Sequence, residues 1–230
     1  MNLKIVLRSL GMLLVCEAIA LLPATLVALF YGDGDFLSFI YTIGLLLLVG
    51  VPLTFIKTRN MTIFAKDGFA IVALGWLLIS LFGALPFYFS GAIPSYIDCF
   101  FEASSGFTTT GSTILTAIEG LPRGILFWRS FTHWVGGMGI LVFAIAILPS
   151  LGVGSMQILK AESPGPIVGK LVPKIGQTAK ILYSIYLGIT LLEVILLCLA
   201  GMSVYDAFIH ALGTVGTGGF SNMNASVGHY

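Results

Sequence analysis

Five apolar stretches of this 230-residue chain are each long enough to cross the hydrocarbon core of a membrane, which takes about 20 helical residues. The predicted spans are residues 5–31, 36–56, 68–89, 125–149 and 181–202. Only 9% of the residues are charged. Soluble domains carry about 25% charged residues, so lipid must surround most of this chain. We therefore expect an all-α integral membrane protein.

The charged residues divide between alternate connections, and this division predicts an orientation. Basic residues gather near the N-terminus and in every second connection: Lys4, Arg8, Lys57, Arg59, Lys66, Lys160, Lys170, Lys174 and Lys180. The other connections are mainly acidic and contain Asp33, Asp35, Asp98, Glu102, Glu119 and a single arginine, Arg123. Because positively charged loops remain inside, the N-terminus is predicted to be cytoplasmic and residues 90–124 and 203–230 to face outward.

The two outward stretches repeat one pattern. Each begins with an apolar run, Tyr96–Phe107 or Val204–Val215, and twelve helical residues rise only about 18 Å, too little to cross a membrane. Each run ends in threonine and glycine, as Thr108-Thr109-Thr110-Gly111-Ser112 and Gly216-Thr217-Gly218-Gly219-Phe220. A gapless alignment pairs Asp98 with Asp206, Phe100 with Phe208, Ala103 with Ala211, Thr109 with Thr217 and Gly111 with Gly219. The chain therefore contains an internal repeat.

Such a unit can bind a cation. A half-helix that enters from outside directs the negative end of its dipole toward the membrane centre. Glycine can adopt positive φ, so successive carbonyl groups can face one axis and replace the hydration shell of an ion. Outer loops with ordinary turn glycines are the alternative, which the duplication makes the weaker interpretation. The predicted filter residues are Thr109, Thr110, Gly111, Thr217, Gly218 and Gly219, flanked by Thr108, Ser112, Gly216 and Phe220.

The sequence resembles the Trk/Ktr/HKT superfamily of potassium transporters, in particular its bacterial TrkH/TrkG type. Besides the two Thr/Gly loops, the resemblance rests on motifs along nearly the whole chain: His133-Trp134-Val135-Gly136-Gly137-Met138-Gly139-Ile140, Ala161-Glu162-Ser163-Pro164-Gly165-Pro166, Thr178-Ala179-Lys180, Gly218-Gly219-Phe220-Ser221 and Asn224-Ala225-Ser226-Val227-Gly228. The resemblance implies potassium uptake across the bacterial inner membrane, with no cofactor. It implies potassium binding at Thr109, Thr110, Thr217 and Gly218.

The resemblance also implies an architecture. The family builds its pore from four span–half-helix–span repeats with re-entrant filter loops. Residues 1–60 would be an additional helix pair, 61–155 the first repeat, and 156–230 a cytoplasmic connection with an incomplete second repeat. Because only two of four loops are present, we expect a fragment, or one part of a split pore, that does not conduct alone. The family further implies a homodimer with a cytoplasmic nucleotide-binding regulator. Channel-like transport and symport with protons or sodium remain open.

Several other residues have two interpretations each. Gly136, Gly137 and Gly139 are expected to allow close helix packing, with a place in the inner pore as the alternative. Arg129, on one helical face with His133, is expected to extend toward the outer surface or, alternatively, to pair with an acid. The remaining candidates are acidic or lysine residues. Glu17 and Glu193 would line the ion path or pair between helices. Asp98 and Asp206 would cap the half-helices or attract cations. The segment from Lys160 to Lys180 would form a solvated inward face, or bind a regulator or anionic lipid.

Other functions have less support. Gly32-Asp33-Gly34-Asp35 and Tyr205-Asp206 match the two motifs of intramembrane aspartyl proteases, but in reversed order and in a short loop. No zinc-protease or serine-hydrolase motif is present in the sequence, so an enzyme is not expected. A net charge of +1 gives no reason to expect a nucleic-acid partner. A non-conducting membrane scaffold or regulatory subunit is the remaining alternative.

Overall fold

The computed structural model describes residues 2–57, 65–139 and 175–230, and every regular element in these ranges is helical. The elements in chain order are α1 (Leu3–Ala20), α2 (Leu22–Tyr31), α3 (Phe36–Thr54), α4 (Ala65–Gly83), α5 (Leu85–Phe89), α6 (Tyr96–Phe107), α7 (Arg123–Gly137), α10 (Ile175–Leu199), α11 (Val204–Val215) and the 3-10 helix η2 (Ser226–His229).

Four of the five predicted spans are confirmed as helical units long and apolar enough to cross a membrane. They are Leu3–Tyr31, Phe36–Thr54, Lys66–Phe89 and Lys180–Leu199. The first and third each consist of two consecutive helices, and a proline occupies the first turn of the second helix, Pro23 in α2 and Pro86 in α5. Proline lacks a backbone N–H and so disrupts a continuous helix but fits a helix start.

The fourth predicted span differs from expectation. A single helix over residues 125–149 is wrong, because α7 ends at Gly137 and Gly139 adopts φ 66°. The rest of that span, residues 140–149, lies outside the described residues. So do Arg59, the lysines Lys160, Lys170 and Lys174, and the motif formed by residues 161–166.

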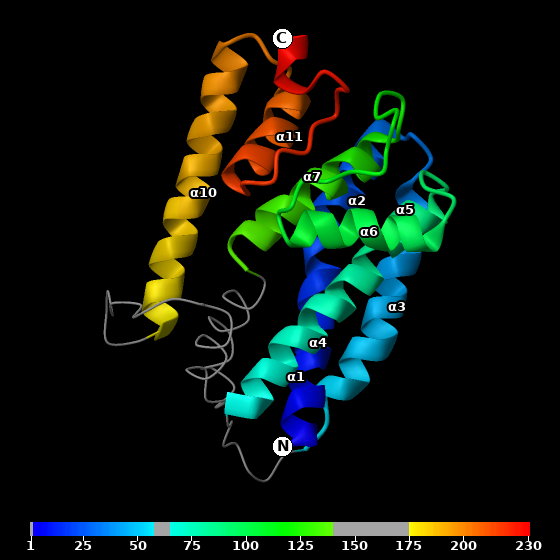
Figure 1. The fold of residues 1–230 in the computed structure, drawn as a ribbon, viewed down its shortest axis with the longest axis vertical. Helices are drawn as coiled ribbons and strands as arrows, with labels where there is room; N and C mark the ends of the chain where they lie inside the picture. Colours follow the sequence, from blue (N-terminus) through cyan, green and yellow to red (C-terminus); the bar gives the residue numbers. More distant parts are fainter. Residues whose placement is uncertain (1, 58–64, 140–174) are drawn as a thin grey trace.

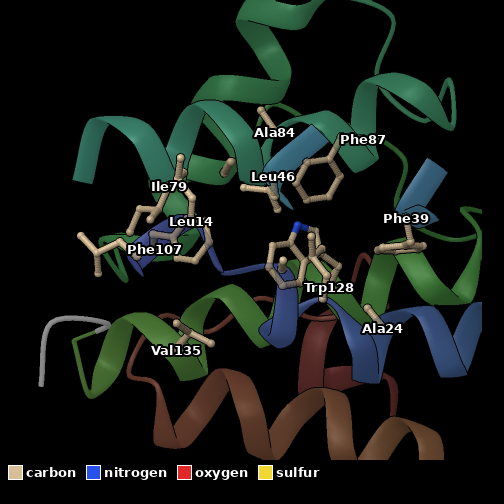
Figure 2. Packing of buried hydrophobic residues seen from close by; sticks show 14 of the residues in the cluster. Leu14, Ala24, Phe39, Leu46, Ile79, Ala84, Phe87, Phe107, Trp128 and Val135 are labelled. Atoms are coloured by element: carbon tan, nitrogen blue, oxygen red, sulfur yellow. The ribbon is translucent and has the colours of Figure 1, made fainter. Parts of the chain in front are cut away.

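The helices α1, α3 and α4 pack together beside α6 and α7, while α10 and α11 form a second group (Figure 1). The half-helix α6 lies across the directions of α1 and α4 (Figure 1). Buried side chains from α1, α3, α4, α5, α6 and α7 form one apolar core, among them Leu14, Leu46, Ile79, Phe87, Phe107 and Trp128 (Figure 2). Large apolar side chains remain exposed on α3 and α10, as expected for surfaces that face lipid.

The loop between α2 and α3 caps another helix. Asp33 accepts a hydrogen bond from the backbone N–H of Arg123 at 3.0 Å, and Asp35 accepts one from Ile125 at 3.0 Å. Both donors belong to the first turn of α7, whose N–H groups have no partner within the helix. These two aspartates, the basis of the protease alternative, therefore serve as caps supplied by a distant loop.

Replacing Asp35 with alanine is expected to destabilise the protein by about 1–2 kcal/mol, the usual cost of losing a cap. Burial raises the pKa of the Asp35 carboxyl, and asparagine would keep an oxygen acceptor without the charge that burial disfavours. Asp35→Asn should therefore melt near the wild-type temperature. Thermal unfolding of the purified variants in detergent measures both effects. Equal melting temperatures for the alanine and asparagine variants would contradict the capping role.

Candidate ion-binding site

The two predicted half-helices are confirmed to the residue as α6 and α11. A serine caps each N-terminus. The Ser95 hydroxyl accepts a hydrogen bond from the backbone N–H of Asp98 at 3.5 Å, and the Ser203 hydroxyl accepts one from the backbone N–H of Asp206 at 3.2 Å. The expectation that Asp98 and Asp206 provide these caps is therefore wrong. The aspartates lie in the first turn, where their charge favours the positive end of the helix dipole. The Ser-x-x-Asp spacing, typical of a capping box, was the signal that the prediction overlooked.

The Asp206 carboxylate is itself held in place. Its two oxygens accept hydrogen bonds from Ser203 at 2.7 Å and from the Asn222 side chain at 2.6 Å. Burial alone would raise the pKa of Asp206, but hydrogen bonding by Ser203, Asn222 and Tyr230, together with the nearby His210, outweighs it and lowers the pKa below its ordinary value. The N-terminal end of α11 therefore carries a fixed negative charge at neutral pH.

The two Thr/Gly loops adopt the same backbone conformation. Thr108 and Gly216 end their helices near φ −81° and −70°. Three equivalent hydrogen bonds then fold each loop back on its helix: Thr108 to Ser104, Thr109 to Gly106 and Thr110 to Ser105 in the first, and Gly216 to Leu212, Thr217 to Thr214 and Gly218 to Gly213 in the second. The structure therefore repeats at the level of individual backbone bonds.

Positive φ occurs at the same places in both loops. Thr109 and Thr217 have φ 55° and 62°, and Gly111 and Gly219 have φ 75° and 81°. Glycine tolerates this conformation, whereas a β-branched residue there is a steric outlier. Sequence reasoning assigned positive φ to the glycines and missed the threonines. Strained residues persist where the surrounding structure enforces them, often at functional sites.

The two loops meet beside α7. A Cβ atom added to Gly111 would overlap the carbonyl oxygen of Gly218. Helix α7 contacts the end of both half-helices through adjacent glycines, since a Cβ on Gly136 would overlap the carbonyl oxygen of Phe107 and one on Gly137 would lie 2.9 Å from the Cα of Gly216. Close packing is thus confirmed for Gly136 and Gly137.

A polar pair lies behind each loop, in the same repeat register. In the first copy Thr113 donates to the Glu102 carboxylate at 2.8 Å. In the second, the Ser221 hydroxyl lies 3.0 Å from His210 Nε2. The hydroxyl oxygens of Thr113 and Ser221 also accept backbone N–H bonds, from Leu115 and Met223. Sequence reasoning missed both pairs, although the alignment that pairs Asp98 with Asp206 also places Glu102 on His210.

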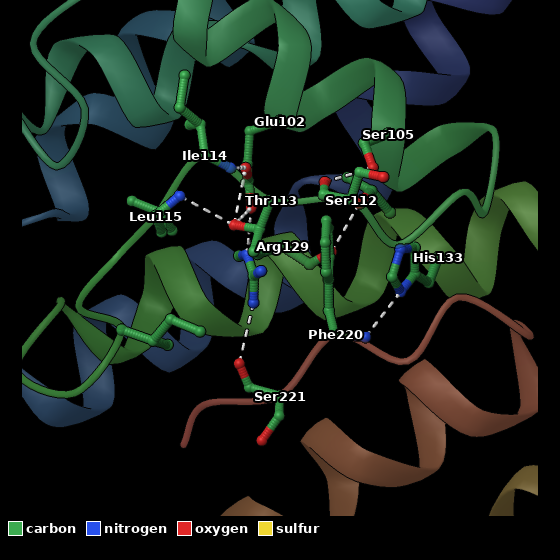
Figure 3. Close-up of polar contacts among 12 residues, drawn as sticks. Glu102, Ser105, Ser112, Thr113, Ile114, Leu115, Arg129, His133, Phe220 and Ser221 are labelled. Atoms are coloured by element: carbon green, nitrogen blue, oxygen red, sulfur yellow. Dashed lines mark hydrogen bonds and ion pairs between the residues drawn. The ribbon is translucent and has the colours of Figure 1, made fainter. Parts of the chain in front are cut away.

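The environment of Arg129 corrects another expectation. Its side chain does not extend to the surface: the residue is 1% exposed and pairs with Glu102, at 2.5 Å between Nε and Oε1. Its Nη1 donates to the carbonyl oxygen of Ser221 at 2.9 Å. One turn away, His133 Nδ1 accepts from the backbone N–H of Phe220 at 3.3 Å (Figure 3). The alternative of an acid partner is confirmed.

The two intramembrane glutamates differ. Glu17 is fully buried, and its carboxylate oxygens have no hydrogen-bond partner among the described residues. Glu193 of α10 is half-buried and interacts with Thr214 and His210 of α11, which agrees with pairing between helices. A role in the ion path stays a prediction for both. Within the described ranges no three His, Cys, Asp or Glu residues cluster as a metal site.

A pocket of about 650 Å³ is lined by residues of both segments predicted to face outward, 90–124 and 203–230, and by Tyr31 and Asp33. Asp33, Glu119 and Asp206 contribute to its lining together with Arg123. Each carboxylate already accepts a hydrogen bond. Asp33 accepts one from the backbone N–H of Arg123, and Glu119 accepts one from the backbone N–H of Asn224. Asp206 accepts one from the side chain of Asn222. Of these bonds, the one between Glu119 and Asn224 joins residues 90–124 to residues 203–230.

Comparison with known proteins places these features in a family. Residues 36–230 match the family model TrkH, described as a cation transport protein. The Trk system potassium uptake protein TrkH of Vibrio parahaemolyticus is 42% identical over 233 residues, which cover all of this chain and 48% of that protein. TrkH and TrkG of Escherichia coli, with the same coverage, are 41% and 33% identical.

A solved structure agrees with these sequence matches. The crystal structure of the potassium transporter TrkH from Vibrio parahaemolyticus is similar to this chain with a TM-score of 0.83 and 38% identity. The similarity covers 100% of this chain and 46% of the other. The chain therefore spans about half the length of the relatives it matches.

Proposed function

This chain belongs to the TrkH family of cation transport proteins, and on that premise we propose that it forms part of a pore for potassium uptake. The two Thr/Gly loops would supply the selective element, with potassium held by main-chain oxygens of Thr109, Thr110, Thr217 and Gly218. Relatives named as potassium uptake proteins support the choice of ion. An enzymatic function is excluded by family membership.

The observation that carries this proposal is the identical turn in both loops. Each alternates from right-handed backbone at Thr108 or Gly216 to left-handed backbone at Thr109 or Thr217. In a β-strand successive carbonyl groups point in opposite directions. Left-handed residues interrupt that alternation, which allows neighbouring carbonyls to share a side. The C-terminal ends of α6 and α11 add the negative ends of two helix dipoles near the same loops.

Two loops cannot surround a dehydrated potassium ion, for which known filters use four. We propose that further repeats complete the pore and that residues 1–230 alone do not conduct. We also propose an N-terminus in the cytoplasm of a bacterial cell, assembly as a homodimer, and regulation by a nucleotide-binding cytoplasmic subunit. A scaffold that never conducts is the second candidate, and it is favoured only by the count of two loops.

Growth of a bacterium that lacks its own potassium uptake systems tests this proposal. The complete gene product that carries this chain should restore growth at low potassium, whereas residues 1–230 expressed alone should not. Membrane levels of both proteins are compared by immunoblot as the control. Failure of the complete product to restore growth, at normal membrane levels, would contradict potassium uptake. Rescue by residues 1–230 alone would contradict the need for further loops.

A further inference from the structure

We propose that Arg129 is a positioning residue that locks the two Thr/Gly loops to each other and thereby maintains selectivity among monovalent cations. The inference rests on the proposed function, since it assigns a role within the same filter. Arg129 belongs to α7, between the two loops, and it contacts both repeats while touching no proposed ion ligand directly. Its role would be exerted through Glu102, Phe220 and Ser221.

The contact with the first repeat is an ion pair that also fixes the segment after the first loop. Glu102, on half-helix α6, is 0% exposed, and its carboxylate accepts a hydrogen bond from Nε of Arg129 at 2.5 Å. The same carboxylate accepts the hydroxyl of Thr113 at 2.8 Å and the backbone N–H of Ile114 at 3.0 Å. A buried carboxylate is stable only when paired and hydrogen-bonded. Losing Arg129 would therefore also weaken the anchorage of Thr113 and Ile114, two and three residues after Gly111.

The contact with the second repeat reaches the residues that follow Gly219. Arg129 Nη1 donates to the carbonyl oxygen of Ser221 at 2.9 Å, and its guanidinium carbon lies 3.6 Å from the centre of the Phe220 ring. The His133 ring stacks on Phe220 with 3.9 Å between centres. Two groups this close to one ring centre must lie on opposite faces, and Figure 3 shows Phe220 between Arg129 and His133.

This sandwich fixes the backbone as well as the ring. The Phe220 N–H donates to His133 Nδ1 at 3.3 Å, and the same imidazole packs against Gly218, where an added Cβ would overlap it. Phe220 directly follows Gly219, so restraint of its ring and its N–H restrains the second loop. The side chains of α7 thus hold both loops in one relative position, at the point where Gly111 and Gly218 touch.

The chemistry of the site requires arginine in particular. The guanidinium donates in two directions, from Nε to Glu102 and from Nη1 to Ser221, while its flat face covers Phe220. A lysine would keep the charge that balances Glu102, but its ammonium is a compact point charge without a planar fork. Arg129→Lys therefore distinguishes two requirements. Lysine supplies the positive charge beside Glu102, but it cannot bridge the two repeats.

The chain offers a matched control in the same helix. Arg123, at the start of α7, also pairs with an aspartate, Asp33 at 3.7 Å, and covers an aromatic ring, Tyr31 at 4.5 Å. Its side chain is 49% exposed, and no contact joins it to either Thr/Gly loop among the described residues. Arg123→Lys thus makes the same chemical change away from the filter.

The experiment compares the complete gene product with its Arg129→Lys and Arg123→Lys variants, reconstituted in liposomes, by the ratio of potassium to sodium uptake. We expect Arg129→Lys to lower this ratio at least tenfold and Arg123→Lys to leave it unchanged. Phe220→Leu keeps the backbone hydrogen bonds to His133 and Arg129 but removes the aromatic ring, and it should also lower the ratio of potassium to sodium uptake. A ratio equal to wild type in Arg129→Lys, or in Phe220→Leu if the lysine variant does not fold, would overturn the proposal. If the wild-type protein itself shows no potassium preference, the proposed function fails instead.

Discussion

Replacing Gly111 with alanine is expected to lower potassium uptake at least tenfold without removing the protein from the membrane. Gly111 has φ 75°, a left-handed conformation that costs an alanine about 1–2 kcal/mol. The added methyl group would also overlap the carbonyl oxygen of Gly218, which is backbone and cannot rotate away. One loop must therefore move, and the carbonyl groups of both would lose their alignment. Uptake of radioactive rubidium into cells measures the loss.

The control for this substitution is Gly44→Ala. Gly44 lies exposed within α3, where an added Cβ would meet no described atom outside its own stretch of helix within 4 Å. Serine at position 111 adds a hydroxyl to the same strained site and should weaken the preference for potassium over sodium. Normal uptake by Gly111→Ala, with selectivity unchanged in Gly111→Ser, would contradict the assignment of this loop to the filter.

Replacing Gly136 with leucine is expected to prevent accumulation of folded protein. Even the Cβ of an alanine at this position would overlap the Phe107 carbonyl oxygen, so α7 could no longer contact the end of α6. Overpacking by a few methyl groups typically costs about 1–3 kcal/mol, and here the obstacle is backbone. The contact also positions Gly137 against Gly216, so both half-helices would be affected.

Size-exclusion chromatography of detergent extracts measures this effect as loss of the monodisperse peak, and Gly136→Ala should show a lowered melting temperature. The matched control is Gly188→Ala in α10, where an added Cβ meets no other part of the described structure within 4 Å. A stable Gly136→Leu variant with normal uptake would show that α7 and α6 do not need this close approach.

The sequence was informative wherever a local pattern decides the structure. The bounds of α6 and α11 were predicted to the residue from short apolar runs that end in threonine and glycine, although the serine caps at their starts were missed. Four spans follow from hydropathy alone. Hydropathy does not report backbone angles, so the end of α7 at Gly137 was missed inside an apolar run.

Contacts between distant residues were harder to predict. Arg129 and Glu102 are 27 positions apart in sequence, and nothing local distinguishes a paired arginine from one that extends to the surface. The caps that Asp33 and Asp35 supply to α7 join residues 90 positions apart. The pairs Glu102–Thr113 and His210–Ser221 were predictable in principle, because the gapless alignment that found the loops also superimposes these positions.

Crystals of the complete gene product soaked in a thallium or rubidium salt test the central claim most directly, because anomalous scattering locates these potassium analogues without assumptions about the path. The account predicts anomalous peaks in contact with the carbonyl oxygens of Thr109, Thr110, Thr217 and Gly218. Peaks elsewhere along the transport path, with these four oxygens turned away from them, would contradict it.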